Sequence, residues 1–173
     1  MNHSQTFDDY PAWIVILCNA VSWAIYAVGA YVLARVSIWL AVPYLVYILW
    51  LEARLLRNAC VDCAYYGKMC AFGRGKICGA VFQRGDAQRF SAREVSWKDM
   101  IPDLLVSLIP LAGGILLLVL NGWDWLIAGL LLLLLILASS VTGLVRGNLA
   151  CKYCRQKDLG CPAYELFGGE PDA

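Results

Sequence analysis

The chain has 173 residues, of which 61% are hydrophobic and 16% charged. Soluble globular domains are about half apolar and about one quarter charged, so this composition excludes an ordinary soluble domain and indicates contact with lipid. The formal net charge of +1 gives no reason to expect nucleic acid as a partner. The eight cysteines are the second unusual feature of the composition, and they are the residues that carry chemistry.

Four stretches with few or no charged side chains are long enough to cross a bilayer, which takes about 20 apolar residues. In chain order they cover residues 11–34, 36–56, 101–120 and 125–145. The second stretch is the least regular, because Glu52 and Arg54 lie in its last turns, where they reach the headgroup region or each other. Six of the seven tryptophans lie near the predicted ends, as interfacial indoles do: Trp13, Trp39, Trp50, Trp97, Trp123 and Trp125.

Two of the spans carry residues that shape helix packing. Small residues line part of the first span, so a neighbouring backbone can approach it closely: Ala20, Ala24, Ala27, Gly29, Ala30 and Ala34. In the third span, Pro110 with Gly113 and Gly114 predicts a kink or a loosened hydrogen-bond ladder, for which packing is the preferred explanation.

Basic residues near the spans predict the orientation. Four spans place the N-terminus, the 57–99 loop and the C-terminal tail on one face, which holds every Lys and Arg except Arg35. By the positive-inside rule this face is cytoplasmic. Asp8 and Asp9 precede the first span, where a signal peptide carries basic residues, so we expect a retained helix.

Seven cysteines follow the second and fourth spans and repeat their spacing. Cys60, Cys63 and Cys70 have the pattern Cys-x2-Cys-x6-Cys, and so do Cys151, Cys154 and Cys161; Cys78 follows the first triplet. The repeat predicts a duplicated unit of two membrane helices and one cysteine segment. Because each unit crosses twice, the copies are related by an axis along the membrane normal, which brings the two segments together.

The fold class predicted from these features is an all-α integral membrane protein, with four transmembrane helices as two tandem hairpins and a small cysteine-rich cytoplasmic cap. The regions are an N-terminal arm with the first hairpin (1–56), a cysteine-rich basic loop (57–99), the second hairpin (100–146) and a cysteine-containing tail (147–173). The 57–98 segment contains eight basic and three acidic side chains, so anionic lipid headgroups are an expected partner of the loop.

The thiols predict a soft metal site. Disulfides are disfavoured in a reducing cytoplasm, and a Cys-x2-Cys step lets two thiolates converge on one ion. Zinc is the first expectation and an iron–sulfur cluster is the alternative. The candidate ligands are Cys60, Cys63, Cys70, Cys78, Cys151, Cys154 and Cys161.

The sequence leaves the partition of these ligands open. One arrangement gives the first four cysteines their own site, while the second triplet takes a fourth ligand from Cys78, His3, Asp158 or solvent. Another arrangement shares one site between the two Cys-x2-Cys steps. A proline directly after the last cysteine, here Pro162, occurs in bacterial ferredoxin runs. Cys18, inside the first span, is expected to be an apolar packing residue.

Three functions are compatible with such a site. A structural metal would make the protein a membrane scaffold or a docking module for a protein partner. A redox-active cluster or thiol pair would pass electrons to a lipophilic acceptor, and soft-metal handling or transport is the third hypothesis. His3 is the only histidine, so no hydrolytic catalytic set is expected, and any enzyme activity would be that of an oxidoreductase.

Overall fold

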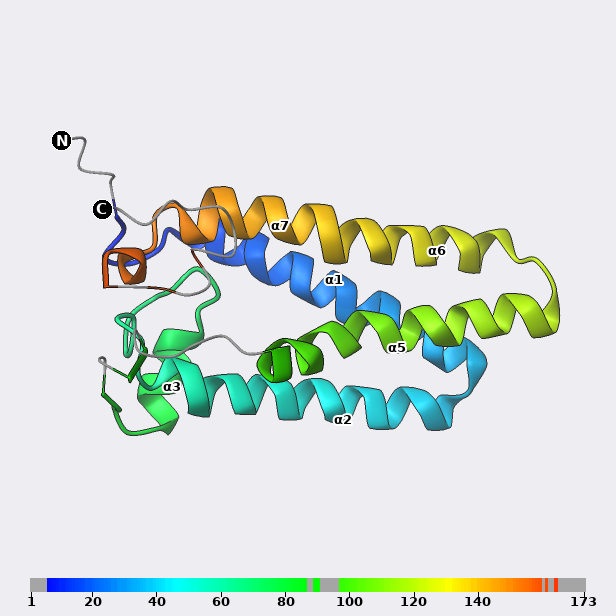
Figure 1. The fold of residues 1–173 in the computed structure, drawn as a ribbon, viewed down its shortest axis with the longest axis horizontal. Helices are drawn as coiled ribbons and strands as arrows, with labels where there is room; N and C mark the ends of the chain where they lie inside the picture. Colours follow the sequence, from blue (N-terminus) through cyan, green and yellow to red (C-terminus); the bar gives the residue numbers. More distant parts are fainter. Residues whose placement is uncertain (1–5, 87–88, 91–96, 160, 162–163, 165–173) are drawn as a thin grey trace. The chain divides into compact units, whose positions relative to one another are not determined.

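The structure, a computed structural model, describes residues 6–86, 89–90, 97–159, 161 and 164. Within these residues the chain is helical, as predicted. The α-helices are α1 (Ala12–Val36), α2 (Ile38–Leu55), α3 (Arg74–Val81), α5 (Trp97–Asn121), α6 (Trp125–Ile136) and α7 (Thr142–Val145) (Figure 1). Three π-helical stretches cover Leu56–Cys60, Leu137–Val141 and Arg146–Cys151, and a 3-10 helix covers Arg155–Leu159.

Four helical stretches are long and apolar enough to cross a membrane, which confirms the four predicted spans. They are Ala12–Val36, Ile38–Cys60, Asp99–Asn121 and Trp125–Cys151. The second and fourth extend beyond their predicted ends, because π-helical turns continue them as far as Cys60 and Cys151. Each cysteine triplet therefore begins on the last residue of a helix of membrane-spanning length.

The chain forms two compact units. The four-helix unit contains Ala20–Glu52 and Ser96–Thr142, and the cysteine-rich unit contains Met1–Asn19, Ala53–Val95 and Gly143–Ala173. All eight cysteines belong to the cysteine-rich unit, and none of them forms a disulfide. The N-terminal arm, the loop and the tail are therefore parts of one unit although they are far apart in the sequence.

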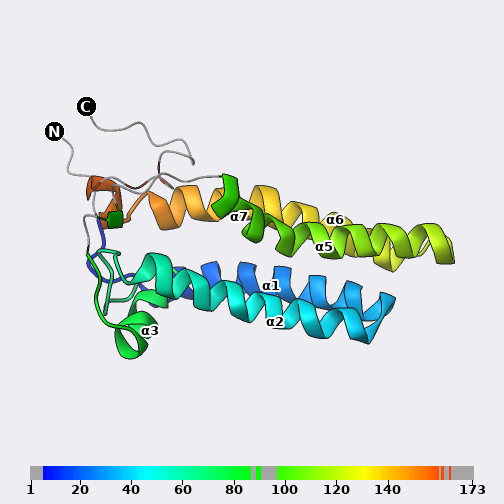
Figure 2. The ribbon, with the colours of Figure 1, turned by 60° about the horizontal axis from the view of Figure 1, so that its bottom comes forward.

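The four-helix unit has an aliphatic core to which all four of its helices contribute, and α5 and α6 run alongside each other as a hairpin (Figure 2). Its buried residues are Ile25, Leu33, Ala41, Tyr44, Ile48, Leu51, Val106 and Leu134. Many large apolar side chains of these helices face outward, among them Val46, Leu116 and Leu132. Lipid is the surroundings in which such an outer surface is stable.

Pro110 in α5 is accommodated by packing. Proline has no N–H, so the carbonyl of Val106, four residues earlier, loses its partner in the helix. The Tyr44 hydroxyl of α2 donates a hydrogen bond to this carbonyl at 2.9 Å. Gly29 of α1 makes room for the tyrosine, because a Cβ at this position would overlap the Tyr44 hydroxyl and lie 3.1 Å from the Pro110 ring. At Gly29 the groups that approach the first span closely are side chains of α2 and α5, whereas the small residues predicted the approach of a backbone.

Candidate metal centre

The two cysteine triplets share a pattern of backbone hydrogen bonds as well as one spacing. In both, the carbonyl of each cysteine accepts a hydrogen bond from the backbone N–H three residues later. The pairs are Cys60–Cys63 (3.4 Å), Cys63–Tyr66 (3.0 Å), Cys70–Gly73 (2.8 Å), Cys151–Cys154 (3.1 Å), Cys154–Lys157 (3.2 Å) and Cys161–Tyr164 (2.9 Å). Because both triplets also start at the end of a π-helical stretch, the repeated spacing corresponds to a repeated local structure.

Backbone N–H groups act on several of the thiols. The N–H two residues after the second cysteine of each Cys-x2-Cys step lowers the pKa of that thiol, against the larger effect of burial; it is Tyr65 for Cys63 and Gln156 for Cys154. The Gly75 N–H lies 3.4 Å from the Cys70 sulfur. Hydrogen bonds of this kind favour a negatively charged sulfur, because the donor stabilises the thiolate more than the thiol.

Thiols from the two triplets come together in the cysteine-rich unit. Negative charge on Cys161 raises the pKa of Cys63, and charge on Cys63 or Cys161 raises the pKa of Cys154. These three sulfurs are therefore within electrostatic range of one another. Cys63, Cys70 and Cys154 also pack against the same buried cluster, which contains Tyr10, Ile14, Cys18, Tyr65, Ala71 and Ala150.

Burial keeps these thiols protonated in the absence of a metal. It is the largest cause that raises the pKa of Cys63 to about 11 and that of Cys154 to about 12. A thiol that exchanges with disulfides needs a lowered pKa, because the thiolate is the nucleophile. The surroundings of Cys63 and Cys154 raise the pKa of both thiols and therefore disfavour this chemistry. A metal ion would have to displace both protons on binding, as it does in other thiolate sites.

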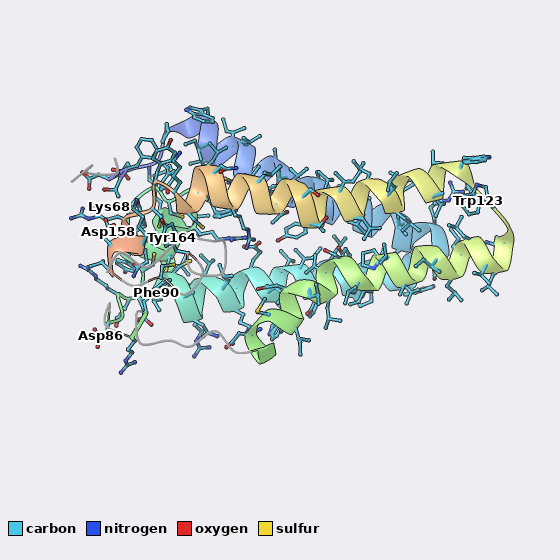
Figure 3. All side chains as sticks on the ribbon, turned by 45° about the horizontal axis from the view of Figure 1, so that its top comes forward. Lys68, Asp86, Phe90, Trp123, Asp158 and Tyr164 are labelled. Carbon is cyan, nitrogen blue, oxygen red and sulfur yellow. The ribbon has the colours of Figure 1, made fainter. Side chains whose placement is uncertain are left out.

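Hydrogen bonds join the loop to the tail next to these thiols. The Gln156 side-chain oxygen accepts from the Ala64 N–H at 2.8 Å, and the Tyr65 hydroxyl accepts from the Arg155 N–H at 3.1 Å. The same hydroxyl donates to the Phe7 carbonyl of the N-terminal arm. In Figure 3, Lys68 of the loop and Asp158 and Tyr164 of the tail lie in the same part of the cysteine-rich unit.

The N-terminal arm bridges the loop and the tail. The Tyr10 N–H donates to the Met69 carbonyl at 2.9 Å, while the Tyr10 hydroxyl donates to the Ala150 carbonyl. Asp9 accepts from the Met69 N–H at 2.7 Å, and Asp8 forms an ion pair with Arg155 at 2.7 Å. The sequence did not predict this role, because Asp8 and Asp9 were interpreted only as evidence for a retained first helix in place of a signal peptide.

Two glycines shape the loop that carries Cys78. Gly73 has a φ of 69°, a conformation that side-chain-bearing residues rarely adopt, and it directly precedes α3. Gly75 is buried against the backbone, since a Cβ there would overlap the Tyr65 carbonyl oxygen. The Cys78 thiol is fully buried and lies 3.6 Å from the Leu56 carbonyl oxygen, to which it donates.

Two guanidinium groups bring positive charge to the thiols. Arg74 and Arg146 lie over the Phe72 ring, with 5.0 and 5.4 Å between the guanidinium carbon and the ring centre. Arg74 is within electrostatic range of Cys60, and Arg146 is within range of Cys18 and Cys151. An ion bound by several thiolates carries net negative charge, which nearby arginines would offset.

The thiols belong to one unit but are not assembled as ligands. Among the residues that the structure describes, no group of three or more His, Cys, Asp or Glu side chains has the geometry to hold a metal ion. Closure around an ion would therefore require thiol side chains to turn. Of the other proposed ligands, Asp158 is exposed and His3 lies outside the described residues; Pro162, which follows the last cysteine, also lies outside them.

Comparisons of the chain with protein-family models, curated proteins and solved structures found no match. The function is therefore argued from the geometry of the cysteine-rich unit and from the four apolar helices. The cysteine-rich unit offers soft donors from two segments, backbone N–H groups that favour thiolates, and two arginines near the thiols.

Proposed function

We propose that the chain is a multi-pass membrane protein whose two cysteine segments together hold a soft metal ion, with zinc as the first choice. The observation that carries the proposal is that Cys63 and Cys70 of the loop and Cys154 of the tail pack against the same buried cluster. Thiolates are soft donors that select zinc, copper(I) or iron–sulfur clusters over hard cations. Cys60, Cys70, Cys78 and Cys151 complete the set from which ligands would be drawn.

The residues around the thiols fit such an ion. The N–H groups of Tyr65 and Gln156 would stabilise bound thiolates, and Arg74 and Arg146 would offset their charge. The metal would cross-link the loop and the tail. A unit with so small an apolar core gains much of its folding free energy from such a cross-link.

The same turns in both triplets support a duplicated unit made of a helical hairpin and a cysteine segment. The distribution of Lys and Arg supports a cytoplasmic location for both segments, where thiols stay reduced. In this arrangement the metal-bound cap serves as a scaffold or a docking surface for a protein partner. The basic loop would be held at anionic headgroups.

An iron–sulfur redox centre is the second candidate. The N–H groups that point at Cys63, Cys70 and Cys154 favour it, because hydrogen bonds to sulfur help a cluster to accept an electron. The electron would pass to a lipophilic acceptor in the membrane. Colour separates the two candidates, since a zinc site is colourless and an iron–sulfur protein is brown.

Metal analysis of the full-length protein in detergent tests the proposal. The wild type is expected to retain zinc, or iron with sulfide, through purification. The double variant Cys63→Ser/Cys154→Ser is expected to lose it, because one ligand is removed from each segment. The matched control is Cys18→Ala, which removes a buried thiol of the same cluster outside both triplets and should keep the metal. A double variant that retains the full metal content would contradict the proposal.

A further inference from the structure

Gln156 carries a polar group that the structure leaves unsatisfied. Its side chain is 2% exposed, and among the described residues Nε2 is the only buried side-chain nitrogen or oxygen without a hydrogen-bond partner. Buried amide donors in folded proteins almost always have an acceptor. The site around Gln156 is therefore one in which an acceptor is expected.

The orientation of the amide is fixed by its other end. The Gln156 oxygen accepts from the Ala64 N–H at 2.8 Å, and a flipped amide would set an NH2 group against that N–H. Because Nε2 can only donate, the missing group must be an acceptor.

The amide links the two segments next to their cysteines. Gln156 follows Cys154 by two residues, and its side-chain oxygen accepts from the N–H of Ala64, the residue directly after Cys63. A neutral thiol is a weak acceptor, whereas a metal-bound thiolate or a cluster sulfide is a strong one. Metal binding would thus create the kind of acceptor that Nε2 lacks.

We propose that Gln156 Nε2 donates a hydrogen bond to sulfur of the metal centre that Cys63 and Cys154 help to form. Gln156 is then a positioning residue: it ties the ligands of the tail to the loop through Ala64 and orients the centre without touching the metal. This inference rests on the proposed function and adds the residue that couples the two segments. Groups that orient metal ligands in this way are worth about 10- to 100-fold in metal affinity.

The variant Gln156→Met tests the role, because methionine keeps an unbranched apolar stem of similar length and removes the amide. Metal-free full-length protein in detergent would be titrated with zinc in competition with a chelator, and with cobalt(II) as a spectroscopic probe. We expect about 10- to 100-fold weaker zinc binding and a shifted thiolate-to-cobalt absorption band. Gln83→Met, which alters an exposed glutamine of the same unit, should match the wild type.

A measurement on the wild type does not depend on the folding of a variant. In protein labelled with nitrogen-15 glutamine, the Gln156 side-chain N–H signals should shift and exchange more slowly with water when zinc is added, while those of Gln83 stay unchanged. Unchanged Gln156 signals at saturating zinc, or a Gln156→Met variant with wild-type affinity and spectrum, would overturn the inference and leave the proposed function standing. A wild type that binds neither zinc nor cobalt would overturn both.

Discussion

The four-helix unit and the cysteine-rich unit are stabilised by different interactions. The first has an aliphatic core, and the Val106 carbonyl, which Pro110 leaves without a partner in the helix, is bound by Tyr44. The second has a small core of tyrosines, thiols and alanines, and it is held by hydrogen bonds among three distant segments. The difference shows what each unit needs from outside. The four-helix unit exposes an apolar surface that lipid would cover, and in the proposed function the cysteine-rich unit gains stability from an ion bound by its thiols.

Metal removal should separate the two units most clearly. In the proposed function the free energy of metal binding contributes to the folding of the cysteine-rich unit, so a strong chelator is expected to loosen this unit. Amide hydrogen exchange in residues 61–66 and 150–157 should rise by about tenfold or more, which corresponds to at least 1.4 kcal/mol of lost local stability. Exchange in α5 and α6 should stay unchanged. An equal rise of hydrogen exchange in both units, or no rise in either, would contradict a metal that stabilises only the cysteine-rich unit.

Gly29→Ala should destabilise the four-helix unit without affecting metal content. The new methyl group would overlap the Tyr44 hydroxyl and press on the Pro110 ring, and overpacking of this kind costs about 1–3 kcal/mol. Unfolding in mixed detergent would measure the loss. Gly129→Ala in α6 is the control, since a Cβ there meets no other atom within 4 Å. Equal stability of the two variants would disprove the close packing of α1 on α2.

Tyr44→Phe should have a smaller effect in the same unit. It leaves the Val106 carbonyl without the donor that Pro110 also fails to supply, and hydrogen bonds between membrane helices are worth about 0.6–1.7 kcal/mol. Tyr31→Phe, at an exposed position of α1, should lie within about 0.5 kcal/mol of the wild type. If the Tyr31 and Tyr44 variants unfold alike, the hydroxyl of Tyr44 has no such role.

The sequence was a good guide where composition and spacing determine the outcome. Stretches with few charged residues correctly predicted the positions of the four spans, because a single ionised side chain at the bilayer centre is costly. The repeated Cys-x2-Cys-x6-Cys spacing pointed to two equivalent segments, and the same turns are found in both. The π-helical turns before Cys60 and Cys151 were missed, since no local pattern of residues distinguishes them from the end of an α-helix.

The remaining features depend on contacts between distant segments. Tyr10 and Asp9 bind the loop and the tail, and Gln156 reaches Ala64 of the loop. Each is an ordinary polar residue in a short segment, so its role appears only when the fold brings the partners together. The link from Pro110 to Tyr44 could have been suspected, because a proline within a span leaves a carbonyl that some neighbouring donor must bind.

X-ray absorption at the metal edge tests the central claim most directly, because it counts the sulfur atoms bound to the ion. The wild-type protein is expected to show four sulfur neighbours at about 2.3 Å if the ion is tetrahedral zinc. The single variants Cys63→Ser and Cys154→Ser should each lower the sulfur count or lose the ion, because the loop and the tail both contribute ligands. A wild-type ion bound only by nitrogen and oxygen, or a sulfur count unchanged in either variant, would contradict a centre shared by the two segments.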